Sequence, residues 1–434
     1  MKIAFVYPHS GFSEPVVKLS DAIAIVTFEL ARRLARDHEV IVYCRRDKGE
    51  PAESRHGNLV FRRFDQTFDF ALFRLRLLET VGLLRPTHPF RFTSLYYRVF
   101  IERVARDIAR ESVDVVHVHN VSSFIPVIRK HAPSSALVLH SHDHALADFD
   151  PDVALARLRM ADLILGCSAH LAGNLRERFP ELEERIEPFV NGVDRRFLEV
   201  ESDPKRSAEV VFVGRLSPEK GVHVLVEAFG RISGEHPDAS LSLIGPNHVP
   251  NKHFVDPFGD DEVLAGIEPY YRKGSGSYLD DLLKAGEGLQ VMMPGPIDNR
   301  ELPARLALAG IFVFASLWQE PFGIPAVEAM AAGLPVIATR AGALPEIVED
   351  GVTGILVDRG DVDGLAGALR TLLDDPERRA AMGRAGRKRV EELFDWDVLA
   401  EGLASHYEAI VAPGQTGRQR RTASADPVPC RRSA

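Results

Sequence analysis

The sequence predicts an α/β protein with two doubly wound parallel-sheet domains, and three observations lead to this fold class. Short apolar runs alternate with amphipathic helical patterns along most of the 434 residues. The runs are almost continuously apolar, which is typical of parallel strands buried on both faces. The alternation breaks at the polar stretch 199–208 and then restarts. A chain of this length also exceeds one ordinary hydrophobic core, so two domains are expected.

The first domain is expected over residues 1–198. Its helix over 22–37 carries apolar residues at helical spacing, and Ser20 or Asp21 can cap its N-terminus. Strands are expected at 2–7, 39–44, 113–119, 136–142 and 163–168.

The second domain is expected over residues 209–395 and repeats the same alternation. Its helices are expected at 219–232 and 361–374, followed by helices near 376–392 and at 396–411. The tail 412–434 is rich in Pro, Ser and Arg, which predicts disorder. Strands are expected at 209–214, 241–245, 288–295, 310–316, 335–339 and 354–357.

Composition excludes several classes of protein. The net charge of −9 and the pI near 6.0 argue against nucleic acid as the main partner. The three cysteines are far apart, so neither a disulfide framework nor a CxxC metal site is indicated, which fits a reducing cytosol. The start MKIAFVYP indicates a strand rather than a signal peptide. No apolar run approaches the roughly 18–20 residues of a membrane span, so we expect a cytoplasmic protein.

The segment 62–110 is locally basic, with ten arginines, no lysine and five acidic residues. One interpretation is peripheral docking at the inner membrane face, or binding of an anionic lipid-linked acceptor. The other is a set of amphipathic helices that line an acceptor cleft and expose a solvated basic face. The sequence leaves both open.

Ligands of open α/β sheets bind beyond the carboxyl ends of the strands, so the loops directly after strands are the candidate sites. After 209–214 comes GRLSPEKGVHVLVEAF, in which Gly214 permits close backbone approach. Arg215 and Lys220 are five positions apart, with Lys220 expected early in the next helix. An anion at that helix N-terminus would meet backbone N–H groups and two cations, which suits a diphosphate without a metal. The alternative is a pair of solvated surface charges.

The loop after 310–316 reads SLWQEPFGIP and carries Glu320. Pro325 suits the first turn of a helix, which places Glu328 in about that first turn. The two glutamates are therefore not expected to face each other as a hydrolytic pair. A better interpretation gives these residues separate roles on one ligand. The backbone of Phe322–Ile324 lies near phosphate or sugar, Glu320 binds sugar hydroxyls and Glu328 binds a diol such as a ribose. The alternative for Glu328 is a charge that serves the helix dipole.

Histidines gather at two strand ends, as His117 and His119 in one and His140, His142 and His144 in the other. This invites a zinc interpretation, but no Cys or Glu stands at metal spacing and the first pair points one way from a buried strand. A single active-site histidine at a strand end is the preferred interpretation, and no metal is expected. No strand-turn-helix carries GxGxxG, which disfavours a dinucleotide oxidoreductase.

Several of these stretches resemble the retaining GT-B glycosyltransferases of glycosyltransferase family 4. They are GRLSPEKGVHVLVEAF, EPFGIPAVEAMAAGLPVIATRAGALPEIVEDGVTGILV, FVNGVD, ELARRLARDHEVIVY and VDVVHVHN, and the similarity covers residues 1 to about 410. The resemblance implies two Rossmann-like domains facing across a cleft, with helix 396–411 crossing back onto the first. It implies transfer of a hexose-type sugar from a UDP- or GDP-linked donor to an acceptor hydroxyl of a glycan, lipid or small molecule, with retained configuration and without a cofactor or metal.

The resemblance also implies roles for individual residues. Arg215 and Lys220 match the pair that holds the donor diphosphate, next to Gly214. Glu320 matches the glutamate near the donor sugar, with backbone contacts from Pro321, Phe322, Gly323 and Ile324. Glu328 matches the ribose-binding glutamate. His142 in HSHD best matches the histidine near the donor sugar.

One departure concerns the acceptor-side loop, where the family usually carries Gly-Gly before the first helix. Here Ser20, Asp21 and Ala22 stand in that place, and Gly11 is the only nearby glycine. Two other function classes stay open: a GT-B-fold nucleotide-sugar epimerase or phosphorylase, and a non-catalytic nucleotide-sugar binder. The insert 246–279 is expected to cover either the cleft or an oligomer face.

Overall fold

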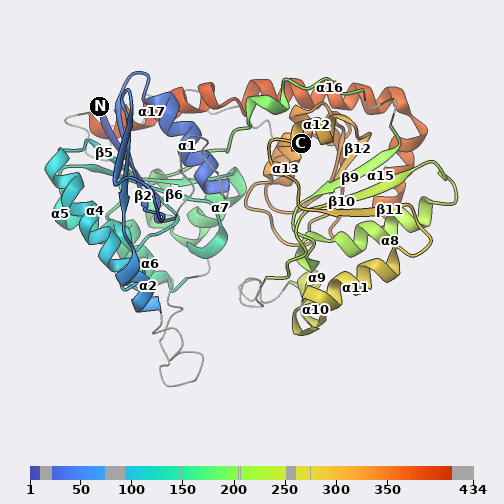
Figure 1. Cartoon of the computed structure of the whole chain (residues 1–434), viewed down its shortest axis with the longest axis horizontal. Helices are drawn as coiled ribbons and strands as arrows, with labels where there is room; N and C mark the ends of the chain where they lie inside the picture. The colour runs from blue at the N-terminus through green and yellow to red at the C-terminus, as the bar shows by residue number, and fades with distance from the viewer. Residues whose placement is uncertain are drawn as a thin grey trace. The chain divides into compact units, whose positions relative to one another are not determined.

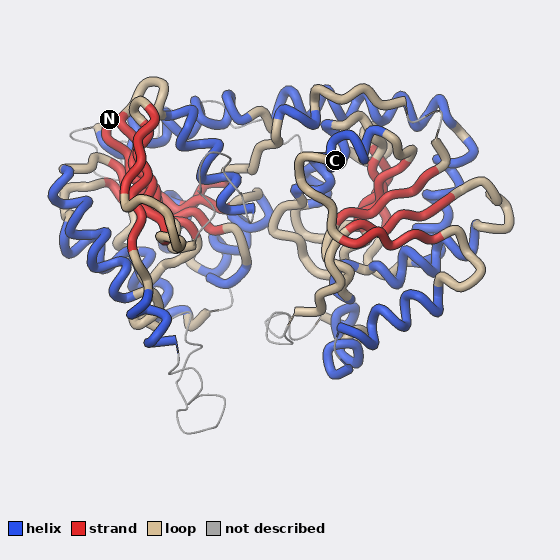
Figure 2. The backbone as a smooth tube through the Cα atoms, viewed as in Figure 1, coloured by secondary structure: helices blue, strands red, loops and turns tan. Residues whose placement is uncertain are grey.

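The computed structural model describes residues 1–9, 22–73, 93–146, 149–203, 205, 207–250, 261–273 and 275–412. The chain divides into two compact α/β units (Figure 1). Unit 1 comprises Met1–Asn191 and Trp396–Ala434, and unit 2 comprises Gly192–Asp395. Each unit contains its own sheet, drawn in red in Figure 2. The predicted fold class is confirmed.

Unit 1 is built on an eight-stranded sheet with the order β3-β4-β2-β1-β5-β6-β7-β8. All neighbours are parallel except β3 and β4. The strands are β1 (Lys2–Val6), β2 (Glu39–Arg45), β3 (Glu53–His56), β4 (Leu59–Phe64), β5 (Val115–His119), β6 (Ala136–Ser141), β7 (Leu163–Gly166) and β8 (Ile186–Pro188). Neither edge strand has a clear signal in the sequence, because β3 is polar and mostly exposed and β8 has only three residues. These two strands and β4 were not predicted.

Helices cover both faces of this sheet. Ile3 and Phe5 pack on one face with α1 and α17, whereas Ala4 and Val6 pack on the other with α4 and α5. This alternation along β1 is the period of two that a strand buried on both faces requires. The helices of unit 1 are α1 (Ala22–Leu34), α2 (Thr67–Phe73), α4 (Arg98–Glu111), α5 (Phe124–His131), α6 (Pro151–Leu158), α7 (Ala169–Arg178) and α17 (Trp396–Val411).

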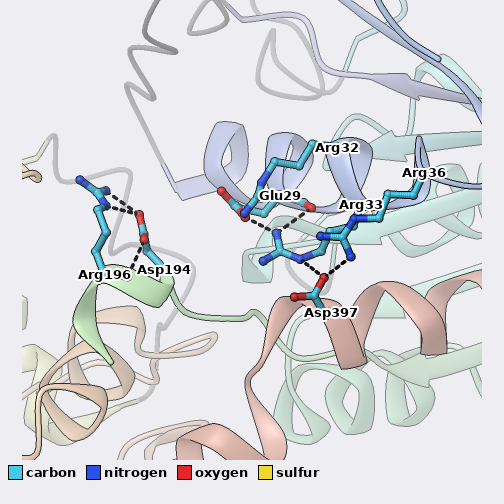
Figure 3. A network of polar contacts seen from close by, with 7 residues as sticks. All are labelled: Glu29, Arg32, Arg33, Arg36, Asp194, Arg196 and Asp397. Carbon is cyan, nitrogen blue, oxygen red and sulfur yellow. Dashed lines mark hydrogen bonds and ion pairs between the residues drawn. The ribbon is translucent and has the colours of Figure 1, made fainter. Parts of the chain in front are cut away.

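Helix α17 follows unit 2 in the sequence but belongs to unit 1, where it packs against α1. Asp397 at its start accepts hydrogen bonds from Arg33 Nε at 3.0 Å and Arg36 Nη1 at 2.6 Å (Figure 3). Arg33 also pairs with Glu29 one turn earlier. The buried apolar side of α17 includes Trp396, which is fully enclosed. A partly buried ion-pair network and an apolar seam therefore attach α17 to α1.

Unit 2 is built on a six-stranded, fully parallel sheet with the order β11-β10-β9-β12-β13-β14. Its strands are β9 (Glu209–Val213), β10 (Ser240–Ile244), β11 (Val291–Gly295), β12 (Ile311–Phe314), β13 (Val336–Thr339) and β14 (Gly354–Val357). Its helices are α8 (Val222–Ile232), α9 (Glu262–Ala265), α10 (Glu268–Lys273), α11 (Ser275–Ala285), α12 (Leu302–Ala307), α13 (Ile324–Ala331), α14 (Leu344–Ile347), α15 (Val362–Asp374) and α16 (Pro376–Leu393).

The boundary of unit 2 differs from the expected linker. The N–H of Val193 donates to the carbonyl of Phe394 at 3.0 Å, which ties the entry of the unit to its exit. The polar stretch 199–208 lies inside unit 2, where Arg387 Nη1 donates to the carbonyl of Val200 at 2.9 Å. The described part of that stretch is therefore held by α16 and its polarity reflects a surface position.

Two further expectations can be compared with the structure. No helix among the described residues combines the length and apolar character that crossing a membrane requires. Cys44 and Cys167 are buried free thiols, and Cys430 lies outside the described residues, as does nearly all of the tail 412–434.

Candidate functional site

The first site loop follows β9 and contains Gly214, Arg215 and Lys220. Its chain forms a 3-10 turn, η5 (Pro218–Lys220), before α8 begins at Val222. Lys220 therefore ends the 3-10 turn, and the expectation of a helical position is wrong. The reason is Gly221, whose φ of +66° breaks the helical path. A Cβ at Gly221 would lie 1.9 Å from the carbonyl oxygen of Ala315, so this close approach requires glycine.

The second site loop follows β12, the strand beside β9 in the sheet. Its Glu320 is held at the backbone by the loop after β13, since Ala343 N–H donates to the Glu320 carbonyl at 2.9 Å. Gly342 N–H donates to Gln319 Oε1 at 2.6 Å. A Cβ at Gly342 would lie 2.2 Å from the Glu320 carbonyl oxygen. Three neighbouring strand ends thus define one site, as expected for an open parallel sheet.

A direct ion pair joins the two loops. Lys220 Nζ lies 2.7 Å from Glu320 Oε1, and the two side chains are 13% and 5% exposed. Ser316 Oγ donates to the same carboxylate oxygen at 2.6 Å. The ammonium also lies 5.5 Å and 5.0 Å from the ring centroids of Phe314 and Trp318. A carboxylate and two aromatic faces therefore hold the Lys220 charge in one place.

Arg215 is paired within its own loop. Its Nη2 lies 3.0 Å from Oε1 of Glu219, a side chain with no solvent exposure. Both expected cations are thus bound to buried carboxylates, which does not fit the alternative of two solvated surface charges. The site presents two positioned cations at the carboxyl end of a parallel sheet, an arrangement suited to a di-anionic group.

Glu328 is the fifth residue of α13 and stands at the start of its second turn, close to the expected position in about the first turn. The helix begins at Ile324 because Gly323, with a φ of +143°, sets the turn before it, and Pro325 occupies its first turn. Dipole effects are concentrated in the first turn, so the structure disfavours a purely dipolar role.

The carboxyl of Glu328 is in an unusual electrostatic environment. Burial raises its pKa to about 8, the Asp194 charge adds to this, and Arg196 opposes it. Asp194 and Arg196 form their own ion pair at 2.5 Å (Figure 3). Glu320, in contrast, binds Lys220 and Ser316. The two glutamates thus have different neighbours.

The turn between the glutamates packs tightly. The Phe322 ring is buried, with its centroid 5.9 Å from that of Phe394. Gly323 has a φ of +143°, which strains any other residue, and a Cβ there would lie 2.7 Å from Leu344 Cδ2 of α14. The Pro321–Ile324 backbone is therefore well fixed, as contacts to a ligand would require.

The histidines of unit 1 form a buried network on the sheet face that α17 covers. His117 Nδ1 lies 2.7 Å from Tyr407 Oη, and its Nε2 lies 3.2 Å from His140 Nδ1. His119 Nδ1 lies 2.9 Å from His142 Nε2. Burial lowers the pKa of all four imidazoles, that of His142 to about 3. The rings are therefore neutral.

Three of these histidines form the one group of described residues whose positions could hold a metal ion. One ring nitrogen from each of His117, His119 and His140 lies within 4.8 Å of the others. However, the rings largely bind one another and Tyr407, and the group contains no carboxylate or thiolate to offset a buried dication. His142 follows the end of β6 and is half-buried, whereas His140 is fully enclosed. The structure thus separates two histidines that the sequence could not.

Some expected site residues lie outside the described residues, namely Gly11, Ser20 and Asp21. Residues 251–260 of the insert do so as well. The described part of the insert forms α9, α10 and the start of α11, and Tyr271 of α10 reaches Glu219 in the first site loop. Sequence reasoning missed Glu219, Ser316 and Tyr271. Of these three, only Glu219 could have been found from the sequence, because it stands between Arg215 and Lys220 in the same short motif.

Comparison with known proteins agrees with this fold. A family model described as "Glycosyl transferases group 1" matches residues 194–389, and one described as "Glycosyltransferase Family 4" matches residues 23–197. Spore coat protein SA of Bacillus subtilis (strain 168) is 28% identical over 325 residues, which cover 71% of this chain and 81% of that protein.

Solved structures share the fold at low sequence identity. Sucrose-phosphate synthase from Thermosynechococcus elongatus superposes with a TM-score of 0.72 at 22% identity, covering 95% of this chain and all of that one. Anabaena Alr3699/HepE in complex with UDP-glucose gives a TM-score of 0.65 at 20% identity, covering 94% of this chain and 100% of that one.

Two parallel-sheet α/β units that superpose on these solved structures, together with the two family models, define a GT-B glycosyltransferase. The two family models together cover residues 23–389. The chain belongs to the group 1, family 4 glycosyltransferases, and its activity is sugar transfer.

Proposed function

We propose that this glycosyltransferase moves a hexose-type sugar from a UDP- or GDP-linked donor to an acceptor hydroxyl and retains the anomeric configuration. The Lys220–Glu320 ion pair at the ends of β9 and β12 carries the proposal. It places a cation for the leaving diphosphate beside a carboxylate for the sugar hydroxyls. The solved complex of HepE with UDP-glucose supports a nucleotide sugar as the donor.

Charge development on the leaving group explains the roles of the two cations. Negative charge grows on the diphosphate as its bond to the sugar breaks, and Lys220 and Arg215 stabilise that charge. Donor binding moves Lys220 from Glu320 toward phosphate. The freed Glu320 carboxylate then accepts hydrogen bonds from the donor sugar. The two cations match two phosphate charges, so this scheme uses no metal.

The remaining roles follow the family mechanism. The acceptor hydroxyl attacks from the face that the diphosphate leaves, and a leaving phosphate oxygen accepts its proton. Neutral His142 accepts or donates a hydrogen bond near the donor sugar, since its low pKa keeps it uncharged. The backbone of Pro321–Ile324 lines the donor, and Glu328 binds the ribose.

The acceptor is assigned to unit 1, whose segment 62–110 is basic in sequence, and residues 74–92 of this segment lie outside the described residues. Several arginines there pair locally, such as Arg62 with Asp107 and Arg98 with Glu102. Phe68 is 65% exposed on α2. An exposed aromatic beside a basic segment supports peripheral membrane contact of a cytoplasmic enzyme, which we keep as part of the proposal.

Retention is tested by the product's stereochemistry. Wild-type enzyme is incubated with UDP- and GDP-hexoses and an acceptor, and the new glycosidic bond is assigned by NMR from its anomeric proton coupling. An α-linked donor should yield an α-linked product. A β-linked product would contradict retention, and an epimerised nucleotide sugar or a sugar phosphate would favour the alternative classes.

The raised pKa of the Glu328 carboxyl leads us to expect that donor binding depends on pH. Its pKa of about 8 leaves it mostly protonated at neutral pH, and the ionised form accepts hydrogen bonds from both ribose hydroxyls. Donor KM should therefore fall as pH rises through about 8, by up to about tenfold per pH unit below that value.

The Glu328→Gln variant serves as the control because it does not titrate, and it should lose this slope. Glu328→Ala should raise donor KM with little change in kcat, as loss of uniform binding does. Steady-state kinetics from about pH 6.5 to about pH 9 would measure both effects. An identical pH slope in wild type and Glu328→Gln would show that another group titrates.

A further inference from the structure

Glu219 is a fully buried carboxylate that the proposed mechanism does not use. It lies in η5, between the two cations of the first site loop, and has no solvent exposure. Its Oε1 accepts from Ser217 Oγ at 2.6 Å and from Arg215 Nη2 at 3.0 Å. Its Oε2 accepts from Tyr271 Oη at 2.8 Å. A buried charge persists only with such partners, so the arrangement is built rather than incidental.

The partners of Glu219 come from two parts of unit 2. Ser217 and Arg215 belong to the site loop itself, whereas Tyr271 belongs to α10 in the insert. Burial, and then the Glu219 charge, raise the pKa of Tyr271, so its hydroxyl stays protonated and donates. The carboxylate therefore links the insert to the guanidinium of Arg215.

A second tyrosine joins the insert to the same region. Tyr278 on α11 accepts from the backbone N–H of His223 at 3.2 Å, and its hydroxyl lies 3.0 Å from His223 Nδ1. His223 is the second residue of α8, directly after the turn that carries Lys220. The described part of the insert thus holds both the carboxylate and the start of the helix behind the loop.

We propose that Glu219 is a positioning residue for Arg215, and that Tyr271 braces it from the insert so that the guanidinium is presented to the donor diphosphate. This inference rests on the proposed function. In this proposal the insert 246–279 supports the first site loop of its own unit, whereas the sequence suggested that it covers the cleft or an oligomer face. Arg215 has a long, flexible side chain, and a fixed carboxylate reduces the entropy lost when it binds phosphate.

The test compares ligands that do and do not carry the diphosphate. Inhibition constants of UDP and GDP, and of uridine and guanosine, are measured for wild type, Glu219→Gln and Tyr271→Phe. Glu219→Gln should weaken the diphosphates about tenfold and leave the nucleosides unchanged, because it removes the carboxylate charge that strengthens the hydrogen bond from Arg215. Tyr271→Phe, which removes one hydroxyl, should weaken the diphosphates by about threefold.

Tyr270, the neighbour of Tyr271 on α10, provides a matched control, because its ring packs against the rings of His223 and Tyr278. Tyr270→Phe should leave all inhibition constants unchanged. Equal diphosphate affinity in wild type and Glu219→Gln would overturn the inference, and so would parallel losses for diphosphates and nucleosides, which indicate a general structural defect. If Glu219→Gln does not fold, Tyr271→Phe tests the inference in its place: it should weaken diphosphate binding and leave nucleoside binding unchanged. Wild-type protein that binds neither diphosphate would instead overturn the proposed function.

Discussion

Replacing Lys220 by alanine should lower kcat by about 10²–10³, the usual cost of one preorganised group that stabilises transition-state charge. Glu320 and two aromatic rings hold the ammonium at the site before the donor binds. Donor binding shifts it to the phosphate, so the cation is already in place when the diphosphate charge grows. KM for the donor should change less than kcat, because the charge that Lys220 neutralises is largest in the transition state. Release of nucleoside diphosphate, followed at saturating donor, measures the effect.

Two controls accompany this variant. Lys205 is a more exposed lysine of unit 2 that pairs with Glu377, and Lys205→Ala should keep wild-type kinetics. The melting temperature of Lys220→Ala shows whether the protein still folds, since the change leaves the Glu320 carboxylate with fewer partners. A folded Lys220→Ala enzyme with a kcat near that of wild type would contradict the assignment of this lysine.

Replacing Glu320 by alanine should lower kcat by about 10²-fold or more, because hydrogen bonds to sugar hydroxyls that strengthen in the transition state supply several kcal/mol. Glu320→Gln should retain a larger fraction of activity, because its amide oxygen still accepts from Ser316 and Lys220. Loss of Glu320 also releases Lys220 from its ion pair. The double variant Lys220→Ala/Glu320→Ala should therefore be less impaired than the product of the single effects.

Two results would contradict the predictions for Glu320. A folded Glu320→Ala enzyme that loses only donor affinity, with unchanged kcat, would make Glu320 a binding residue without a transition-state role. Full multiplicativity of the two single effects would show that the ion pair does not couple the loops. Initial rates at several donor concentrations for the four enzymes distinguish these cases.

The sequence was sufficient for the fold class and for the positions of the two site loops, but not for the parts that Glu219 and Ser316 play in them. Apolar strands of parallel sheets are local signals, and Arg215, Lys220, Glu320 and Glu328 lie within short motifs. The predicted roles of these residues still await the experiments above.

What escaped prediction depends on contacts between distant residues. The 3-10 turn at Lys220 exists because Gly221 packs on the carbonyl of Ala315, nearly a hundred positions away. Tyr271 meets Glu219 from a different segment, and no spacing rule relates them. The helical position expected for Lys220 was wrong for this reason. The raised pKa of Glu328 likewise comes from burial and from Asp194, neither of which the motif reveals.

The most direct measurement is nucleoside diphosphate release by wild-type enzyme from a panel of UDP- and GDP-hexoses, run in parallel with Lys220→Ala. The account predicts release from at least one donor, faster with its acceptor present, and a loss of about 10²–10³ in the variant. Two results would contradict this account. One is that folded wild-type enzyme, given a range of hydroxyl acceptors, releases nucleoside diphosphate from none of the donors. The other is that wild type and Lys220→Ala release it at equal rates.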